Sequence, residues 1–222
     1  MTRPRRSSPS TDTPMSDHAP QRAVAFEFYP TPRDTIEMLI RSPLLALPRG
    51  HWIDPCVGTA RIPSTVNATR RDVYWTLCEI DPRHDDAIRA EMRDVDTLLP
   101  FGDFVIREWT LPRADVLIMN PPFSHALAFV EAAFDRAGWV VMLQRSNWFA
   151  PARSAWLRKH CPDDYRLPER PSFTGDGKTD MAEYSWFVWP PGDRRRREGR
   201  IVMLDALEQP SLFDTLATAS TP

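Results

Sequence analysis

Short apolar runs alternate with amphipathic stretches along most of this chain. The runs at 73–78, 116–119 and 139–143 are almost continuously apolar, as expected of strands that are covered on both faces of a sheet. Segments whose apolar residues recur every three or four positions separate these runs and predict helices. Strands that alternate with helices favour an α/β fold with a doubly wound, mostly parallel sheet.

The expected elements follow one another in a definite order. They are a strand, a glycine-containing turn and a helix in 51–66, a second buried strand in 73–82, a helix over Asp85–Arg93, a third strand or its loop in 101–106, a fourth strand from 115, a helix over 125–137 and a fifth strand in 138–149. Late strands in 183–190 and 199–204 are expected to include an antiparallel partner for the sheet.

A first helix is expected after the extended segment 28–30. Thr31 can cap this helix with Pro32 in its first position, because proline lacks the N–H that the first turn leaves unpaired. Ile36, Leu39 and Ile40 would then form its apolar face.

Composition fits one domain of this kind, since 222 residues with 42% hydrophobic content can form a core. We expect a disordered leader over 1–22, the domain over 23–204 and a flexible tail over 205–222. The leader is basic and rich in Ser, Thr and Pro, and no apolar stretch follows it, so no secretory signal is expected. No apolar run reaches membrane length. The three cysteines show no pairing or metal spacing, which indicates a reducing, cytoplasmic location.

The most informative sequence is Asn120-Pro121-Pro122-Phe123, which ends the fourth strand. The carboxyl end of a parallel strand is where ligands of open α/β folds bind. The Asn120 side-chain carbonyl and the Pro121 main-chain carbonyl can each accept one N–H of a planar amine and so aim its lone pair at a methyl donor. The two prolines add no N–H donors, and Phe123 offers a flat face for a base. A plain Pro-Pro turn after a core strand is the alternative interpretation.

Carboxylates stand at the ends of the other early strands. The segment Asp54-Pro55-Cys56-Val57-Gly58 forms a turn whose glycine lets the backbone approach a ligand. Glu79, followed by Ile80, ends the second strand, where a carboxylate can bind the two ribose hydroxyls of a nucleoside. Asp103 can accept a hydrogen bond from an adenine amine.

With these segments in consecutive order, the chain resembles the S-adenosylmethionine-dependent N6-adenine methyltransferases, in particular the small phage and prophage enzymes with an Asn-Pro-Pro-Phe motif. The resemblance covers roughly Phe28 to Pro190. It implies a Rossmann-like methyltransferase sheet, S-adenosyl-L-methionine as the cofactor and methyl transfer to N6 of adenine in DNA. The catalytic residues that it implies are Asn120, Pro121, Pro122 and Phe123. The donor-binding residues that it implies are Tyr29, Thr31, Pro32, Asp54, Pro55, Cys56, Gly58, Glu79, Ile80 and Asp103.

The chain departs from the family pattern at Ala60, where the turn usually closes with glycine. Cys56 invites comparison with the nucleophile of cytosine-C5 enzymes. It lies in the donor turn instead, and attack by an exocyclic nitrogen needs no covalent intermediate. We therefore expect no catalytic role for Cys56.

Basic and aromatic residues mix between 144 and 183, which makes this stretch a candidate target-recognition insert. The cations expected to contact nucleic acid are Arg145, Arg153, Arg158, Lys159, Arg166, Arg170 and Lys178. A solvated helix around Pro151–His160 with its aromatics in the core is the alternative. The run Arg194–Arg197 is interpreted as a solvated turn or a phosphate contact. Because the net charge is −2, contact with nucleic acid must come from such local patches.

Methylation of an RNA base or of a protein glutamine amide remains an alternative to a DNA activity, as does nucleic-acid binding without catalysis. In the tail, Gln209-Pro210-Ser211-Leu212-Phe213 resembles the short peptide by which bacterial proteins dock on the replication sliding clamp. That resemblance implies Gln209 as the polar anchor, with Leu212 and Phe213 filling an apolar pocket.

Overall fold

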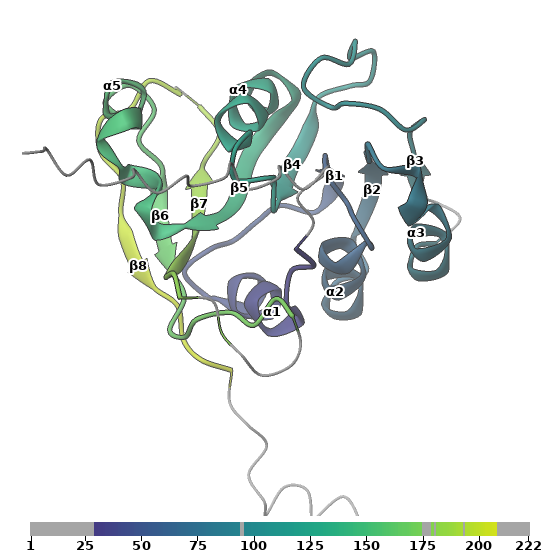
Figure 1. Cartoon of the computed structure of the whole chain (residues 1–222), viewed down its shortest axis with the longest axis horizontal. Helices are drawn as coiled ribbons and strands as arrows, with labels where there is room; N and C mark the ends of the chain where they lie inside the picture. Colours follow the sequence, from purple (N-terminus) through teal and green to yellow (C-terminus); the bar gives the residue numbers. More distant parts are fainter. Residues whose placement is uncertain (1–28, 94–95, 175–178, 180, 193, 208–222) are drawn as a thin grey trace, which may run out of the picture.

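Eight strands of the described chain form one sheet in the order β3-β2-β1-β4-β5-β7-β6-β8 (Figure 1). The computed structural model describes residues 29–93, 96–174, 179, 181–192 and 194–207. The strands are β1 (Gly50–Asp54), β2 (Val73–Leu77), β3 (Thr97–Leu98), β4 (Ala114–Met119), β5 (Ala137–Arg145), β6 (Asp163–Arg166), β7 (Tyr184–Trp189) and β8 (Ile201–Met203).

Within this sheet β7 runs against its neighbours. It pairs antiparallel with β5 and β6, whereas β1 to β5 pair in parallel and β8 pairs in parallel with β6. The expected doubly wound, mostly parallel sheet with a late antiparallel strand is therefore confirmed. Because β2 and β4 flank β1 on opposite sides, the strand order reverses at β1, and ligands of such sheets bind at this point.

Helices cover both faces of the sheet, as Figure 1 shows. They are α1 (Arg33–Arg41), α2 (Arg61–Thr69), α3 (Asp85–Glu91), α4 (Ala126–Arg136) and α5 (Ser154–Leu157). Successive side chains of a strand point to opposite faces. Trp52 accordingly packs in the core that includes α1, α2 and α3, while Ile53 packs in the core that includes α4 and α5. None of the described helices has the length and apolar character that a membrane span requires.

Several elements differ from the sequence prediction. Of the two alternatives for 101–106, a third strand or its loop, the loop is confirmed, and the third strand is the two-residue β3 before it. The helix expected at 151–160 is reduced to a 3₁₀ turn over Pro151–Arg153 followed by the four residues of α5. The strand β6 was not predicted, because its sequence Asp-Asp-Tyr-Arg lacks an apolar run. It lies inside 144–183 and belongs to the same sheet, so part of that stretch builds the domain itself.

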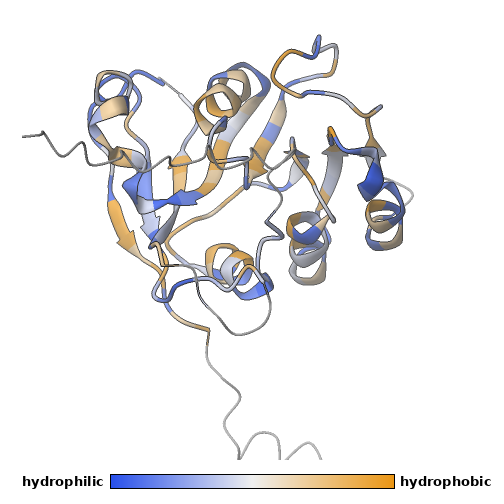
Figure 2. Cartoon of the chain, viewed as in Figure 1, coloured by the Kyte–Doolittle hydropathy of each residue, from blue (hydrophilic) through white to orange (hydrophobic). Residues whose placement is uncertain are grey.

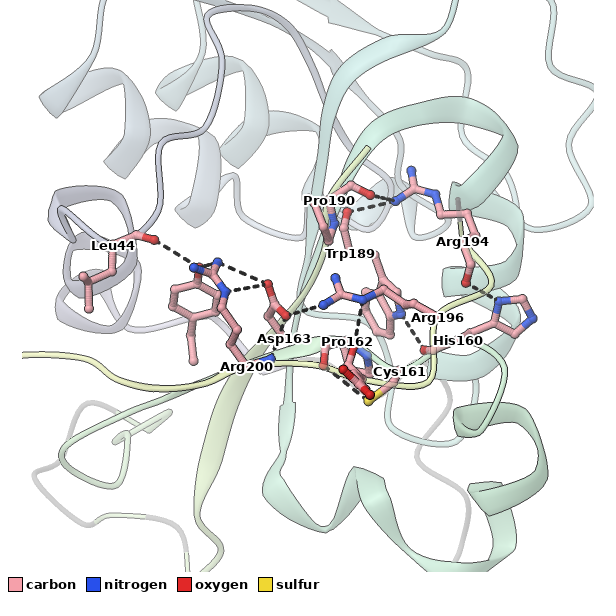
Figure 3. Close-up of polar contacts among 12 residues, drawn as sticks. Leu44, His160, Cys161, Pro162, Asp163, Trp189, Pro190, Arg194, Arg196 and Arg200 are labelled. Atoms are coloured by element: carbon pink, nitrogen blue, oxygen red, sulfur yellow. Dashed lines mark hydrogen bonds and ion pairs between the residues drawn. The ribbon is translucent and has the colours of Figure 1, made fainter. Parts of the chain in front are cut away.

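A polar network holds the last described segment against β6 (Figure 3). The Asp163 carboxylate is buried and accepts hydrogen bonds from the Arg200 amide at 2.8 Å and from the Arg196 guanidinium at 2.7 Å. The Arg200 guanidinium also donates to the Tyr165 hydroxyl, which donates in turn to the Leu44 carbonyl at 3.2 Å. One buried carboxylate thus joins β6, the segment before β8 and the connection between α1 and β1. Figure 2 shows hydrophobic residues on the strand β8 that follows this segment.

The interpretation of Arg194–Arg197 as a solvated turn or a phosphate contact is wrong for two of its members. Arg194 donates to the carbonyls of Trp189, Pro190, Ala137 and Gly138. Burial lowers the pKa of Arg194 to about 10. Arg194 and Arg196 therefore serve the fold, because main-chain carbonyls and a buried carboxylate occupy their donors.

Asp163→Asn is expected to lower the free energy of unfolding by roughly 2–3 kcal/mol, since the amide cannot accept from two arginines as a carboxylate does. Urea denaturation measures the change. Asp72→Asn is the control, because its pair with Arg70 is half-exposed and a surface pair contributes about 1 kcal/mol or less. Equal losses in the two variants would contradict the anchoring role of Asp163.

Candidate active site

A cavity of about 480 Å³ lies at the carboxyl ends of β1, β2 and β4. Its walls come from the turn after β1, the end of β2, the loop after β3 and the start of α4. The predicted site residues that line it are Tyr29, Thr31, Asp54, Pro55, Cys56, Gly58, Glu79, Ile80, Asp103, Asn120 and Pro122. Pro32, Pro121 and Phe123 are not among its lining residues. Residues that are far apart in the sequence therefore meet at the point where the strand order reverses.

The turn after β1 has an unusual backbone. Gly58 and Ala60 both have left-handed φ values, 53° and 57°. Glycine adopts this conformation freely, whereas for an alanine it costs about 1–2 kcal/mol. Ala60, which stands where the resemblance leads us to expect glycine, is fully buried. Its backbone is nevertheless left-handed, so the turn keeps its shape with a different residue.

The Glu79 carboxylate ties this turn to the end of β2. One of its oxygens accepts from the Gly58 amide at 2.6 Å, and the other accepts from the amides of Ile80 and Asp81, each at 2.9 Å. Its side chain is buried, and its orientation is set by three main-chain donors. Since each carboxylate oxygen can accept more than one hydrogen bond, Glu79 keeps capacity for a ligand hydroxyl.

Asp54 is a second buried carboxyl group in the cavity. Burial raises its pKa to about 8, and the nearby Glu79 adds to the increase, although the Cys56 amide donates to it at 3.2 Å. The carboxyl is therefore largely protonated at pH 7, and a positively charged ligand would favour its ionised form. Burial, Asp54 and Glu79 also raise the pKa of the Cys56 thiol well above its usual range. A protonated thiol is a poor nucleophile, which agrees with the expectation that Cys56 has no catalytic role.

The Asn120 side chain has a defined orientation at the end of β4. Its amide nitrogen donates to the Tyr29 carbonyl at 3.0 Å and to the Thr31 hydroxyl at 3.1 Å. A main-chain carbonyl can only accept, so the NH₂ group must face the segment before α1 and the side-chain oxygen must face away from it. The expected capping by Thr31 is wrong, because Pro32 is the N-cap of α1 and no side chain caps the helix. The Thr31 hydroxyl bonds to Asn120 instead.

Aromatic residues gather around Phe123. Its ring stacks on that of Tyr29, with centroids 5.7 Å apart, and lies 6.1 Å from the ring of Tyr184. Phe173 contacts both Tyr29 and Tyr184, and the Arg145 guanidinium lies 4.5 Å from the Phe123 centroid. We call Tyr29, Phe123, Phe173 and Tyr184 the aromatic cluster. Sequence reasoning missed Phe173 and Tyr184, because only the fold brings β7 and the segment before it beside Asn120.

Other lining residues were also missed. Arg61, the first residue of α2, lines the cavity, as do His84, Ser124 and His125. Ser124 directly follows the Asn120–Phe123 segment, and its hydroxyl lies 2.8 Å from Nδ1 of His125. Ser124 and His125 could have been predicted as lining residues, because they lie close to Asn120 in the sequence. No neighbouring motif marks Arg61 or His84.

The predicted nucleic-acid contacts have varied surroundings. Arg153 lies over the Trp148 ring at 4.4 Å. Arg170 pairs with Glu183 at 2.7 Å and Arg166 with Asp164 at 3.1 Å. Arg158 and Lys159 are exposed. Lys178 lies outside the described residues, as do Gln209, Leu212 and Phe213, which were predicted to contact the sliding clamp.

The comparisons with known proteins concern the fold. No family model matches the sequence, and a search of the curated proteins found no match. The candidate RNA methyltransferase PH1948 from Pyrococcus horikoshii covers 74% of this chain and 87% of its own length, at 15% identity and a TM-score of 0.59. The predicted O-methyltransferase Atu636 from Agrobacterium tumefaciens covers 75% and 86%, at 20% identity and a TM-score of 0.55.

A dimethyladenosine transferase from Plasmodium falciparum covers 74% of this chain and 64% of its own length, at 10% identity and a TM-score of 0.54. At such identities the likeness establishes the fold alone. The chain therefore has the Rossmann-like methyltransferase fold, which confirms the fold class expected from its sequence.

Without added ligand, Asp54→Asn is expected to raise the free energy of unfolding at high pH. Between the ordinary carboxyl pKa of about 4 and the folded value of about 8, the folded state binds one more proton than the unfolded state, so stability falls as pH rises through this window. The amide has no such dependence. Variant and wild type should unfold alike at about pH 4, and the variant should be more stable by at least about 2 kcal/mol at about pH 9.

Urea denaturation at the two pH values measures this difference. Asp86→Asn, on the exposed surface of α3, controls for the loss of one negative charge. A stability difference between Asp54→Asn and wild type that does not change with pH would contradict the raised pKa.

Proposed function

We propose that this protein transfers a methyl group from S-adenosyl-L-methionine to N6 of adenine in DNA. The observation that carries the proposal is the orientation of Asn120. Its amide nitrogen is held by Tyr29 and Thr31, which turns its oxygen away from them as an acceptor beside a cavity with buried carboxyl groups. An acceptor fixed in this way suits an amine nitrogen that must be oriented before it can attack.

The cavity suits the proposed cofactor in size and in donor chemistry. A volume of about 480 Å³ lies within the range of ligand pockets, roughly 300–1,000 Å³. Glu79 would hold the ribose hydroxyls, Ile80 would pack on the donor adenine, and Asp103 would accept from its amine. Asp54 and the turn through Gly58 would hold the methionine part, with Tyr29, Thr31 and Pro32 completing the donor site. When bound, S-adenosyl-L-methionine would supply an electrophilic methyl group.

Asn120 and its neighbours would act on the target nitrogen. The Asn120 oxygen and the Pro121 carbonyl would each accept one N–H, drawing the nitrogen out of conjugation with the ring. An asparagine cannot take up a proton at neutral pH, so its role is orientation, and the proton of the product would leave to solvent. Pro122 lines the cavity and, like Pro121, adds no competing donor.

The aromatic cluster favours a nucleobase as the substrate. Phe123 and its aromatic neighbours could hold a base that has left the duplex, at a cost of a few kcal/mol of unstacking. Arg145, Arg153, Arg158, Lys159 and Arg170 supply positive charge between β5 and β7 for the phosphates, and Lys178 would add to it. Docking on the sliding clamp through Gln209, Leu212 and Phe213 stays a prediction from the sequence.

RNA is the second candidate substrate, because PH1948 is described as an RNA methyltransferase. The likeness in fold does not distinguish DNA from RNA, so a direct comparison of substrates must decide.

Purified protein is expected to form N6-methyladenine in duplex DNA, and Asn120→Ala should lose activity by about 100-fold or more, as happens when an oriented polar group in an active site is removed. Methylated nucleosides after digestion measure the activity. Binding of S-adenosylhomocysteine by calorimetry should stay within about threefold of wild type, because the donor contacts lie on other residues.

Asn147→Ala, an exposed asparagine after β5, is the matched control and should remain active. An Asn120→Ala variant with near wild-type turnover would contradict the catalytic assignment. Parallel assays on RNA and on a glutamine peptide decide the substrate, and faster methylation of either would replace DNA in the proposal.

Arg61→Gln is expected to weaken binding of S-adenosyl-L-methionine by about tenfold, because the charge-assisted contact of Arg61 with the donor carboxylate is lost. Binding of the decarboxylated analogue should weaken by about twofold or less. Asp54, Glu79 and Asp103 suit the cationic and hydroxyl groups of the donor, whereas its carboxylate needs a cation such as Arg61. Calorimetry with both ligands measures the difference.

Arg83→Gln is the control, because Arg83 pairs with Asp81 and does not line the cavity. Equal losses of affinity for the two ligands in Arg61→Gln would show that Arg61 does not contact the carboxylate.

A further inference from the structure

The loop between β3 and β4 forms one wall of the cavity without regular secondary structure. Gly102, Asp103, Phe104 and Val105 line the cavity, and neither helix nor strand occurs from 99 to 113. The position of Asp103 therefore depends on individual contacts that hold the loop.

Local bonds shape the loop around Asp103. The Gly102 amide donates to the Glu79 carbonyl at 2.8 Å. The Asp103 side chain accepts from the Val105 amide at 2.8 Å, and its carbonyl accepts from the Arg107 amide at 3.1 Å. These bonds form a turn over 103–107, but apart from the Gly102 bond they do not attach that turn to the rest of the domain.

Arg136, the last residue of α4, makes that attachment. Its guanidinium donates to the Phe104 carbonyl and, at 3.0 Å, to the Arg107 carbonyl. It also lies 4.3 Å from the Phe104 ring centroid and 5.2 Å from that of Trp109. Phe104 is buried and stacks on Phe129 of α4, with centroids 5.8 Å apart. One side chain thus holds the loop at two carbonyls and two rings.

We infer that Arg136 is a positioning residue for recognition of the donor adenine. It holds the carbonyl of the residue directly after Asp103, and so sets where the Asp103 carboxylate meets the adenine amine. This inference rests on the proposed function, because that function assigns Asp103 to the donor. Arg136 itself does not line the cavity. It lies at the far end of α4, the helix that follows the proposed catalytic residues.

The planar guanidinium is well suited to this role. Its N–H groups form a rigid fork that can reach two carbonyls while its face lies on an aromatic ring. A lysine ammonium keeps the charge but lacks both the fork and the flat face, so it cannot make all four contacts together. Loss of Arg136 leaves two loop carbonyls without this donor and the turn over 103–107 less constrained.

The test compares two ligands that differ at the adenine amine and at the adjacent N1 of the base. Wild-type protein should bind S-adenosylhomocysteine about tenfold or more tightly than S-inosylhomocysteine, which has an oxo group in place of the amine. Arg136→Ala should lose about tenfold in affinity for the first ligand and about twofold or less for the second, so that the preference disappears. Calorimetry on the full chain measures both affinities.

Arg113→Ala is the matched control. Arg113 anchors the same end of α4 by donating to the Phe134 and Ala137 carbonyls at 3.1 and 2.6 Å, without a bond to the turn over 103–107. It should keep the ligand preference even if its melting temperature falls. Asp103→Ala should lose the preference as Arg136→Ala does, and the double variant should lose no more than either single variant.

Arg136→Lys covers the case in which the alanine variant does not fold, and it too should lose the preference. Equal loss of affinity for the two ligands in Arg136→Ala or Arg136→Lys would overturn the inference, because it would indicate a general structural role. A wild-type protein that binds both ligands equally would overturn it as well. A wild-type protein that binds neither would contradict the proposed function itself.

Discussion

The carboxylate of Glu79 joins the ends of two strands at the centre of this fold. It accepts hydrogen bonds from the Gly58 amide in the turn after β1 and from two amides at the end of β2. The ends of adjacent parallel strands lead into separate loops. The hydrogen bonds of Glu79 therefore set the distance between the cavity walls that follow β1 and β2. Two other wall residues are placed by separate contacts: Asn120 is held by Tyr29 and Thr31, and the loop that carries Asp103 is held by Arg136.

The site keeps several features that do not favour stability. Asp54 is buried beside Glu79 with a raised pKa, and Ala60 has a left-handed backbone. Both are unfavourable for folding, and the apolar cores on the two faces of the sheet offset them. Large buried aromatics such as Trp52, Trp75 and Trp186 supply much of that core. The cavity proposed to hold a charged ligand therefore sits on a scaffold with ample apolar burial.

The two halves of the sheet are held in different ways. The strands β1 to β5 are buried by helices and depend on apolar contacts. The late strands β6 and β8 depend on the Asp163 network, which also reaches the connection before β1 through Tyr165 and Leu44. Two arginines of the run near the end of the domain, Arg194 and Arg196, accordingly bond within the fold. Arg194 donates to main-chain carbonyls at the start of β5 and the end of β7, and Arg196 donates to the Asp163 carboxylate.

The sequence by itself determined those features that are local. Apolar runs marked β2, β4, β5 and β7, because strands buried on both faces must be apolar along their length. The turn and helix that follow β1 marked that strand. The groups of the proposed site were visible because Asp54, Glu79 and Asn120 directly follow such runs, and parallel strands bring their carboxyl ends to one edge.

Tertiary structure alone decided the rest. It made a strand of the polar segment β6, since neighbouring strands and buried ion pairs override its weak pattern. The Thr31 hydroxyl, predicted from the sequence to cap a helix, instead accepts a hydrogen bond from Asn120, 89 residues away. Tertiary structure also brought Arg136 to the loop of Asp103 and Phe173 to Phe123. Such contacts join residues that are distant in sequence, and no local periodicity records them, because they form only when the sheet brings their elements together.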